Sequence, residues 1–308
     1  MSAKIAVVGS LNMDLVVLTP RIPAPGETII GGEFNVIPGG KGANQAIAAA
    51  RLGGDVSMVG RVGEDDFGAA LIQNLETAKI EHQHVRRHTE AATGVALIEV
   101  DDEAQNSIVV APGANLVLSR ADVEQAEATI AQADILLLQL ESPLEAITRA
   151  AEIAHANQTT VILNPAPAQP VPANLLTLVD ILVPNESETA LLTDLPVDTE
   201  EEIRAAGQKL QALGVGAVIL TLGERGAFLV SPEKTQLYPT FSVTPIDTTA
   251  AGDCFLGGLA VALGEGKSLA DAIQWGNAAG ALATTKLGAQ PSAPTRDSLQ
   301  ALLAEQGS

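Results

Sequence analysis

The segment Asp247–Asp253 places two carboxylates on either side of small residues, and an apolar stretch with helical character follows it. Ala250, Ala251 and Gly252 would let an anionic group approach the backbone closely. A helix that begins here would direct free N–H groups and its positive dipole end at that anion, and would keep Asp253 ionised in its first turn. A carboxylate in that place can take a proton from a hydroxyl, so the segment predicts phosphoryl transfer. A capped helix after a loop explains the same residues without any chemistry.

Four further polar clusters follow or connect expected strands, and each has a chemical and a purely structural explanation. Asn12 and Asp14 follow the first strand and can hydrogen-bond vicinal hydroxyls, although a simple turn uses the same residue types. Residues 39–45 open a helix on which Lys41 and Asn44 share a face. A flexible loop with a polar helix start is the alternative for that segment.

The other two clusters lie later in the chain. Asn185 and Glu188 would share the first turn of a helix and orient a hydrated Mg²⁺ on nucleotide phosphates, while a capping arrangement explains them almost as well. Residues 221–226 join two strands, and their glycines suit either a phosphate or adenine edge or a tight turn. Because the clusters come at successive strand ends on one side of the expected sheet, we interpret them as parts of one site.

The elements that must position these clusters alternate between short apolar, β-branched runs and longer amphipathic stretches. The runs lack period-two alternation, which suits strands covered on both faces. The expected strands are residues 4–9, 56–60, 134–139, 160–164, 180–184 and 217–221, and the expected helices are residues 42–52, 66–77, 120–131, 143–156 and 199–213. With right-handed crossovers, this order predicts a three-layer α/β/α fold with a mainly parallel central sheet.

Two segments break the alternation. Residues 15–18 and 28–34 are typical of a strand, a Pro/Gly turn and a second strand, and residues 93–100 and 106–110 predict another hairpin with residues 101–105 as its turn. We expect the two pairs to form a small sheet outside the main one. Antiparallel additions to the edge of the main sheet are the alternative.

Composition excludes several classes of function. The chain has 308 residues, a net charge of −20 and 46% hydrophobic residues, so it can bury a large core and should repel nucleic acid and anionic membranes. It has no apolar run long enough to span a bilayer, its N-terminus does not resemble a signal peptide, and its single cysteine, Cys254, permits no disulfide framework. We therefore expect a cytoplasmic protein.

Other familiar chemistries are missing from the sequence. Gly40-Lys41 is not part of a Walker-type loop, no G-x-G-x-x-G follows the first strand, and there is no H-E-x-x-H. His82, His84 and His88 lie close together, but their polar surroundings predict a solvated loop more than a metal site. Cys254 is interpreted as a small apolar helix residue.

The chain resembles the ribokinase/phosphofructokinase-B family of carbohydrate kinases nearly from end to end. Gly39–Gly53, with Asn44 inside it, is similar to the first signature of the family, and Asp247–Ala260 is similar to the second. The resemblance implies a ribokinase-like fold, with residues 1–308 as a single kinase domain. It also implies a β-sheet lid, formed by about residues 13–38 and 91–111, that pairs with the lid of a second copy in a homodimer.

The resemblance further implies ATP-dependent phosphorylation of a sugar's primary hydroxyl, with Mg²⁺ and K⁺ as cofactors. Asp253 would be the catalytic base, and the backbone of Ala250, Ala251 and Gly252 the anion hole. The implied sugar contacts are Asn12, Asp14, Gly40, Lys41, Asn44, Glu141 and Asp253. The implied nucleotide contacts are Asn185, Glu188, Thr221, Gly223, Glu224, Arg225, Gly226, Gly252 and Asn277. The implied K⁺ loop, which binds largely through backbone carbonyls, comprises Asp247, Thr249, Ala283, Lys286, Gly288 and Ser292.

Within this family, Asn12-Met13-Asp14, the segment from Gly40 to Asn44, and Glu141 favour D-ribose as the sugar, to be phosphorylated at its 5-hydroxyl. Deoxyribose, fructose and a nucleoside are the alternatives, although a nucleoside base would need aromatic or apolar walls and the chain is only 2% aromatic. A catalytically silent sugar-binding regulator is the non-enzymatic alternative. Such a regulator is expected to lack Gly252 or Asp253, and both are present.

Overall fold

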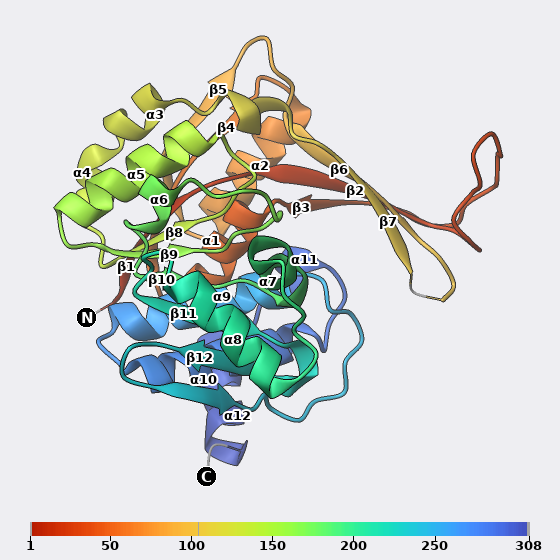
Figure 1. Cartoon of the computed structure of the whole chain (residues 1–308). Helices are drawn as coiled ribbons and strands as arrows, with labels where there is room; N and C mark the ends of the chain where they lie inside the picture. Colours follow the sequence, from red (N-terminus) through yellow and green to blue (C-terminus); the bar gives the residue numbers. More distant parts are fainter. Residues whose placement is uncertain (1, 104, 307–308) are drawn as a thin grey trace.

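The computed structural model of the chain describes residues 2–103 and 105–306. A nine-stranded sheet lies at its centre, built from β1 (Lys4–Val8), β4 (Asp55–Gly63), β5 (Glu81–His88), β8 (Ile135–Leu138), β9 (Thr160–Leu163), β10 (Ile181–Leu182), β11 (Ala217–Thr221), β12 (Ala227–Val230) and β13 (Thr235–Tyr238). The strand order is β13-β12-β11-β10-β9-β8-β1-β4-β5 (Figure 1). All neighbours from β11 to β5 are parallel, and only β12 and β13 run antiparallel to their neighbours.

Helices cover both faces of this sheet. One layer contains α1 (Lys41–Arg51), α2 (Asp66–Thr77), α9 (Ala251–Gly264), α10 (Leu269–Ala283) and α12 (Arg296–Gln306), and the other contains α3 (Arg120–Gln125), α4 (Glu127–Ala131), α5 (Leu144–Ala156), α6 (Ala173–Leu176) and α8 (Glu200–Gln211). Within β1, Ile5 and Val7 pack into the first core, while Ala6 and Val8 pack into the second. Strands buried on both faces explain the continuous apolar runs, and the predicted three-layer fold is confirmed.

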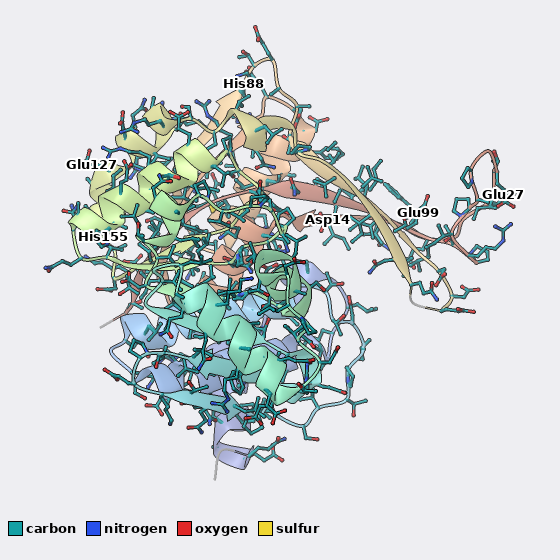
Figure 2. All side chains as sticks on the ribbon, in the orientation of Figure 1. Asp14, Glu27, His88, Glu99, Glu127 and His155 are labelled. Atoms are coloured by element: carbon teal, nitrogen blue, oxygen red, sulfur yellow. The ribbon has the colours of Figure 1, made fainter. Side chains whose placement is uncertain are left out.

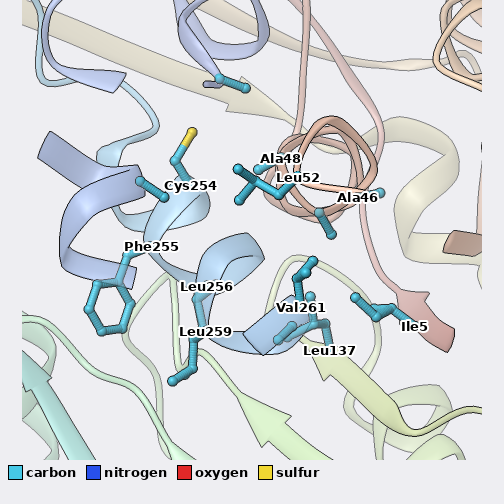
Figure 3. Packing of buried hydrophobic residues seen from close by; sticks show 14 of the residues in the cluster. Ile5, Ala46, Ala48, Leu52, Leu137, Cys254, Phe255, Leu256, Leu259 and Val261 are labelled. Atoms are coloured by element: carbon cyan, nitrogen blue, oxygen red, sulfur yellow. The ribbon is translucent and has the colours of Figure 1, made fainter. Parts of the chain in front are cut away.

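Helix α9 packs unusually closely against its neighbours because small residues face them. A side chain on Gly257 would collide with Ala48 of α1, and one on Gly258 would collide with the backbone of Trp275 in α10. Figure 3 shows the apolar side chains of α9 beside those of α1 in the same core. This packing brings the first turns of α1 and α9 together beside the carboxyl ends of the central strands β1 and β8.

A separate sheet of β3 (Phe34–Gly39), β2 (Asn12–Leu18), β6 (Gly94–Val100) and β7 (Asn106–Ala111), in that order, projects from the body of the molecule (Figure 1). Figure 2 shows Asp14 near its base and Glu99 farther out. The expectation of a small sheet outside the main one is therefore confirmed. We refer to these four strands as the small sheet.

One strand of the small sheet was placed wrongly. The sequence predicted a strand at residues 28–34, but β3 begins at Phe34 and runs to Gly39. The register pairs Phe34 with Val17 and Gly39 with Asn12. Because β2 ends at Leu18, residues 28–32 lie beyond the end of the strand with which they would have to pair. The turn predicted at residues 101–105 includes position 104, which lies outside the described residues.

Two other expectations need correction. The stretch with His82, His84 and His88 is the edge strand β5 and not a loop, since an edge strand can carry polar side chains toward solvent. The helix expected at residues 120–131 is interrupted at Ala126, where α3 ends and α4 begins. Among the described residues, no group of three or more His, Cys, Asp or Glu side chains is arranged to hold a metal ion.

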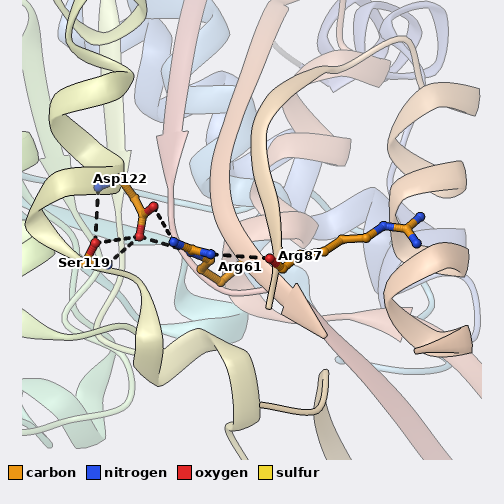
Figure 4. A network of polar contacts seen from close by, with 4 residues as sticks. All are labelled: Arg61, Arg87, Ser119 and Asp122. Carbon is orange, nitrogen blue, oxygen red and sulfur yellow. Dashed lines mark hydrogen bonds and ion pairs between the residues drawn. The ribbon is translucent and has the colours of Figure 1, made fainter. Parts of the chain in front are cut away.

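An ion pair between Arg61 and Asp122 connects α3 to the main sheet, and neither residue belongs to the polar clusters that the sequence singled out. Arg61 of β4 donates two hydrogen bonds to Asp122, of 3.1 Å from Nε and 2.6 Å from Nη2, and Asp122 also caps α3 together with Ser119 (Figure 4). Asp122 is buried, and the hydrogen bonds from Arg61 compensate for the loss of water around its charge. In the part of the chain that the structure describes, no helix has the length and apolar character needed to cross a membrane.

Candidate active site

Asp253 lies in the first turn of α9, where its buried carboxylate faces the start of α1. Its Oδ2 accepts a hydrogen bond of 3.0 Å from Nδ2 of Asn44, and its Oδ1 accepts one of 3.0 Å from Nε2 of Gln45. Each carboxylate oxygen therefore has an amide donor from α1. Two segments that the sequence singled out separately are joined here by direct contact.

The backbone beside Asp253 has the features of an anion cradle. The N–H groups of Gly252 and Asp253 have no backbone partner among the described residues. A side chain built on Gly252 would meet no atom within 4 Å, so open space lies in front of that residue. Ala250, the N-cap, has a left-handed φ of 58°, a conformation that costs a non-glycine residue about 1–3 kcal/mol. The chain thus holds a strained turn where it exposes these donors.

Lys41 is surrounded by carboxylates. Glu141 accepts a hydrogen bond of 3.1 Å from the backbone N–H of Lys41 and another from the hydroxyl of Ser10. Burial alone would lower the pKa of Lys41, but attraction by Asp253, Glu141 and Glu188 outweighs it and raises the pKa. The ammonium therefore stays charged at the centre of an acidic site.

Asp14 and Asp253, two of the carboxyl groups near Lys41, have raised pKa values. Burial, with repulsion from Glu141 and Asp253, raises the pKa of Asp14 to about 7. Burial also raises the pKa of Asp253, against the opposite influence of Lys41, Gln45 and Asn44. The sequence predicted that the helix N-terminus would simply keep Asp253 ionised, but desolvation is the larger effect. These groups can therefore exchange protons at a pH closer to neutrality.

A cavity of about 180 Å³ opens beside Lys41 and Asp253. The predicted residues that line it come from four separate segments: Lys41, Asn185, Glu188, Thr221, Ala250, Ala251, Gly252 and Asp253. Its other lining residues, which the sequence did not single out, are Asn164, Ala166, Val183, Thr248 and Leu256. The interpretation of the strand-end clusters as one site agrees with this common lining.

The predicted sugar residues of the small sheet lie at its junction with the body. Asn12 is buried, and its Oδ1 accepts a hydrogen bond of 2.7 Å from Asn115. Gly40 has a φ of 88° and lies against the backbone of Leu11 and Asn12, where no side chain would fit. The Oδ1 of Asn44 is buried without a hydrogen-bond partner among the described residues. An unpaired buried acceptor next to Asp253 is suited to a hydroxyl donor.

The Asn185 cluster caps a helix and also lies at the wall of the cavity. Asn185 is the N-cap of α7 (Glu186–Thr193), and Glu188 completes the capping box with a hydrogen bond of 2.8 Å from the N–H of Asn185. The backbone of Asn185 also forms a bridge with Thr221. The cap therefore fixes Asn185 and Glu188 at the cavity wall, and burial raises the pKa of Glu188.

The remaining predicted nucleotide residues lie outside the cavity lining. Gly223, Glu224 and Arg225 form a short 3-10 helix that joins β11 to β12, and Gly226 follows it with a φ of 96°. Arg225 forms an ion pair with Glu186 on α7. Asn277 donates hydrogen bonds to the carbonyls of Tyr238, at 2.9 Å, and Pro239, at 3.2 Å. The side chains of Arg225 and Asn277 thus hold neighbouring segments together.

Asp247 ties together the loops that contain the predicted cation residues. Its Oδ1 accepts hydrogen bonds from the N–H and hydroxyl of Thr249, at 2.9 and 2.6 Å, and its Oδ2 accepts one of 2.8 Å from the N–H of Gly288. These hydrogen bonds outweigh partial burial and lower the pKa of Asp247. Ala283 and Lys286 are linked by a backbone hydrogen bond, and Ser292 bonds back to the carbonyl of Ala289.

Sequence reasoning missed the layer of amides behind Asp253. Gln45 contacts Asp253 directly, Gln139 donates to Gln45 at 2.6 Å, and Asn164 lies at the cavity wall. One signal was available, because Gln139 and Asn164 each follow an apolar strand directly, as the recognised clusters do. Gln45 follows Asn44 in α1, where the sequence gives no sign that it differs from an ordinary polar helix residue.

Comparison with known proteins agrees with this geometry. A family model described as pfkB family carbohydrate kinase matches residues 2–296. The chain belongs to the pfkB family of carbohydrate kinases. This finding confirms the resemblance drawn from the two signatures and identifies the chain as a kinase.

Relatives with similar sequences are named as kinases of two different sugars, ribose and deoxyribose. Ribokinase from Haemophilus influenzae is 44% identical over 296 residues, which cover 96% of this chain and 97% of that protein. Deoxyribokinase from Salmonella typhimurium is 40% identical over 254 residues, which cover 82% and 83%. The structure of Arabidopsis thaliana ribokinase complexed with ribose and ATP is similar with a TM-score of 0.91 and 36% identity, over 98% of this chain and 99% of that one.

Proposed function

We propose that the chain is an ATP-dependent ribokinase, which transfers the γ-phosphoryl group of ATP to the 5-hydroxyl of D-ribose. The observation that carries the proposal is the position of Asp253 in the first turn of α9, beside unbonded N–H groups and at the wall of a cavity. The names and coverage of the relatives support the choice of sugar and nucleotide.

In this proposal, the 5-hydroxyl oxygen attacks the γ-phosphorus, and the bond from that phosphorus to the β,γ-bridging oxygen breaks to release ADP. Asp253 accepts the hydroxyl proton, for which a pKa raised toward the working pH is favourable. The N–H groups of Gly252 and Asp253 stabilise charge on the transferred group, and Lys41 adds a positive charge nearby.

The charges of the site favour a neutral sugar over a sugar phosphate. Among the described residues, Lys41 is the one cation that is coupled to Asp253, Glu141 and Glu188, and Asp14 lies beside the same carboxylates. Carboxylates and amides can bind several hydroxyls, whereas a second phosphate on the acceptor would be repelled. We assign Asn12, Asp14, Gly40, Lys41, Asn44 and Glu141 to the sugar.

The nucleotide would occupy the cavity between Asp253 and the Asn185 cap. Asn185, Glu188 and Thr221 line its wall, and the turn from Gly223 to Gly226 lies beyond the end of β11. Glu188 and Asn185 offer oxygen ligands suited to hydrated Mg²⁺, which would neutralise phosphate charge when bound. Asn277 supports this region through Tyr238 and Pro239 and is not assigned a direct contact.

A monovalent cation, K⁺, would bind behind the anion cradle. Hard oxygen donors suit such an ion, and the carboxylate of Asp247, whose pKa is lowered, keeps negative charge in this loop. Thr249, Ala283, Lys286, Gly288 and Ser292 are assigned to the site with Asp247. The ion would hold the loop that leads into Ala250 and so shape the cradle without touching the substrates.

The small sheet would be a lid over the sugar, formed by about residues 13–38 and 91–111, and we propose that two lids pair in a homodimer. Support comes from apolar side chains that are exposed on both of its faces. Val36, Leu97 and Val109 share one face, and Ile108 and Val110 share the other. Exposed apolar surface of this kind marks a contact site.

The test is a coupled assay of ADP formation with ribose, deoxyribose, fructose, 2-keto-3-deoxygluconate and adenosine, each with Mg²⁺ and with K⁺, Na⁺ or neither. We expect the highest kcat/KM with ribose and a higher rate in K⁺. Deoxyribose is the second candidate because a deoxyribokinase is 40% identical. A higher kcat/KM for any other acceptor would reject ribose, and equal rates in all salts would reject K⁺ activation.

The same assay tests the catalytic base. Asp253→Asn should reduce kcat by roughly 10²–10⁴, the range for loss of a general base, while ATP binding measured by calorimetry persists. A variant with wild-type kcat would reject the role of Asp253 even if the sugar assignment holds.

A further inference from the structure

A chain of buried amides lies behind Asp253 and is not used by the proposed reaction. Gln45 of α1 donates 3.0 Å from Nε2 to Oδ1 of Asp253, and its Oε1 accepts a hydrogen bond of 2.6 Å from Nε2 of Gln139. Gln45 and Gln139 have no solvent exposure. The chain connects the end of β8 to the first turn of α9 through one helix residue.

The contacts fix which end of Gln45 faces Asp253. Because Gln139 donates to the Oε1 of Gln45, the Nε2 must point the other way, toward the carboxylate. Its second hydrogen faces Oδ1 of Asn164 at 3.5 Å, and Asn164 is itself held by a 2.9 Å hydrogen bond to the carbonyl of Val183. Every donor and acceptor of the Gln45 amide therefore has a protein partner.

The surrounding packing holds Gln139 in its donating position. A side chain on Gly9 would collide with Oε1 of Gln139, so the absence of a side chain at Gly9 provides the space. That oxygen has no hydrogen-bond partner among the described residues, and water does not reach it. The amide that orients Gln45 is thus enclosed next to Gly9, the residue that follows β1.

We propose that Gln45 is a positioning residue for the proposed phosphoryl transfer, which holds the carboxylate of Asp253 toward the acceptor hydroxyl, and that Gln139 fixes Gln45 in the donating orientation. This inference rests on the proposed role of Asp253. Asn44 supplies the other hydrogen bond to the carboxylate but also has a free oxygen for substrate, so the two neighbours have different tasks. Gln45 is turned away from substrate and acts only through Asp253.

Replacement of Gln45 leaves the charges around Asp253 unchanged. The charged and titratable groups that face Asp253 are Lys41 on α1, Asp14 on β2, Glu188 on α7 and the adjacent Cys254. Gln45 is neutral, and methionine has a similar length but cannot donate a hydrogen bond. Gln45→Met therefore isolates the loss of one donor to the carboxylate.

The experiment compares Gln45→Met, the double variant Gln45→Met/Gln139→Leu, and Gln211→Met on α8 as a matched control. In Gln45→Met, kcat should fall by about 10- to 100-fold, the effect of one hydrogen bond to a charged group, while the KM values for sugar and ATP change less than about two-fold. Gln139 loses its acceptor in this variant, so stability should also fall. The double variant removes both amides and should regain stability but keep the low kcat.

A second readout needs no substrate. Carboxyl-carbon NMR of ¹³C-aspartate protein, assigned with Asp253→Asn, follows the titration of Asp253 directly. In both variants this titration should move up by about one pH unit, because the ionised carboxylate loses a donor. Wild-type kcat and an unmoved titration in Gln45→Met would overturn the inference, as would a kcat that recovers together with stability in the double variant. Wild-type protein without sugar kinase activity would instead reject the proposed function, and the titration would still decide the role of Gln45.

Discussion

At the scale of residues, the site gathers more negative charge than it can neutralise internally. Asp14, Glu141, Asp253 and Glu188 lie around Lys41, and burial strengthens their mutual repulsion. Such an arrangement costs stability in the empty protein, and bound hydroxyls and a divalent cation would relieve it. A site that is destabilising until it is filled is a common consequence of function.

Gly252 offers a test of the anion cradle that leaves all charges in place. A methyl group on Gly252 meets no protein atom, so Gly252→Ala should fold normally and fill only the space in front of the free N–H groups. We expect kcat to fall by about 10²-fold or more, the effect of losing one such donor, because the phosphoryl group can no longer approach the backbone. Steady-state kinetics and thermal unfolding measure the two effects.

Gly32→Ala, in the segment between β2 and β3, is the control, since its added methyl makes only an ordinary contact at 3.6 Å with the carbonyl of Leu18. Gly252→Ala with the kcat of the control would show that nothing approaches this backbone during turnover. A large loss of melting temperature would instead indicate that the position is structurally required.

Asp14 should make the stability of the sugar-free protein depend on pH. Its folded pKa of about 7 lies above its ordinary value of 3.8, so its contribution to stability is fully present below about pH 4 and is lost as the pH rises through 7. Asp14→Asn cannot ionise, and its melting temperature relative to the wild type should therefore rise from pH 5 to pH 8 and then level off. The same variant should bind sugar more weakly.

Thermal unfolding across this pH range checks the prediction, with Asp102→Asn in an exposed turn as the control for loss of a carboxylate. A melting-temperature difference that is the same at pH 5 and pH 8 would contradict the assignment. Activity at saturating sugar separates the stability effect from the binding effect.

At the scale of elements, the sequence predicted those features whose signal is local. Strands β1, β8 and β9 could be predicted from their uninterrupted apolar runs, which arise because both faces of these strands are covered. Strand β5 does not, since Val85 is its only buried residue and the edge of the sheet tolerates the rest. The predicted start of β3 was wrong because the start of this strand depends on its pairing register with β2, and no local sequence pattern encodes that register.

The same reasoning divides the candidate site. Gly252 and Asp253 could be predicted because small residues beside a carboxylate at a helix start have a chemistry of their own. Gln45 could not, because its partners Asp253 and Gln139 lie 208 and 94 residues away in the chain and its role exists only once they meet. Long-range amide contacts leave no periodicity or spacing in the sequence.

The junction between the body and the small sheet depends on Asn115. Its side chain accepts from the N–H of Leu11 at 2.9 Å and donates to the carbonyl of Leu11 and to Oδ1 of Asn12. Asn115→Ala should free the amide of Asn12 and raise the KM for sugar by about ten-fold, the effect of one misplaced hydrogen bond, with little change in the KM for ATP. Asn106→Ala on the surface of β7 is the control, and equal changes in both KM values would contradict a local role.

At the scale of the whole molecule, the main body buries its apolar side chains in two cores, whereas the small sheet leaves several apolar side chains exposed. The small sheet projects outward from the body (Figure 1). Two buried cores cover both faces of the nine-stranded sheet, whereas apolar side chains are exposed on both faces of the small sheet. Its outer strands β3 and β7 have no further partner among the described residues. Open edges and exposed apolar side chains make such a sheet a favourable place for contact with another surface.

The proposed pairing of lids predicts that one charge on the small sheet changes the assembly. Val109 is 62% exposed and lies opposite Leu97, so Val109→Lys would place a charge within the apolar face while leaving the main body untouched. We expect the mass from light scattering to fall from a dimer to a monomer and the KM for sugar to rise, because an unsupported lid closes less well. Leu213→Lys, which is 45% exposed beyond the end of α8, is the control and should keep the dimer. A monomeric wild-type protein, or a variant that remains dimeric, would contradict pairing through this face, and the exposed apolar strands would then need a different partner.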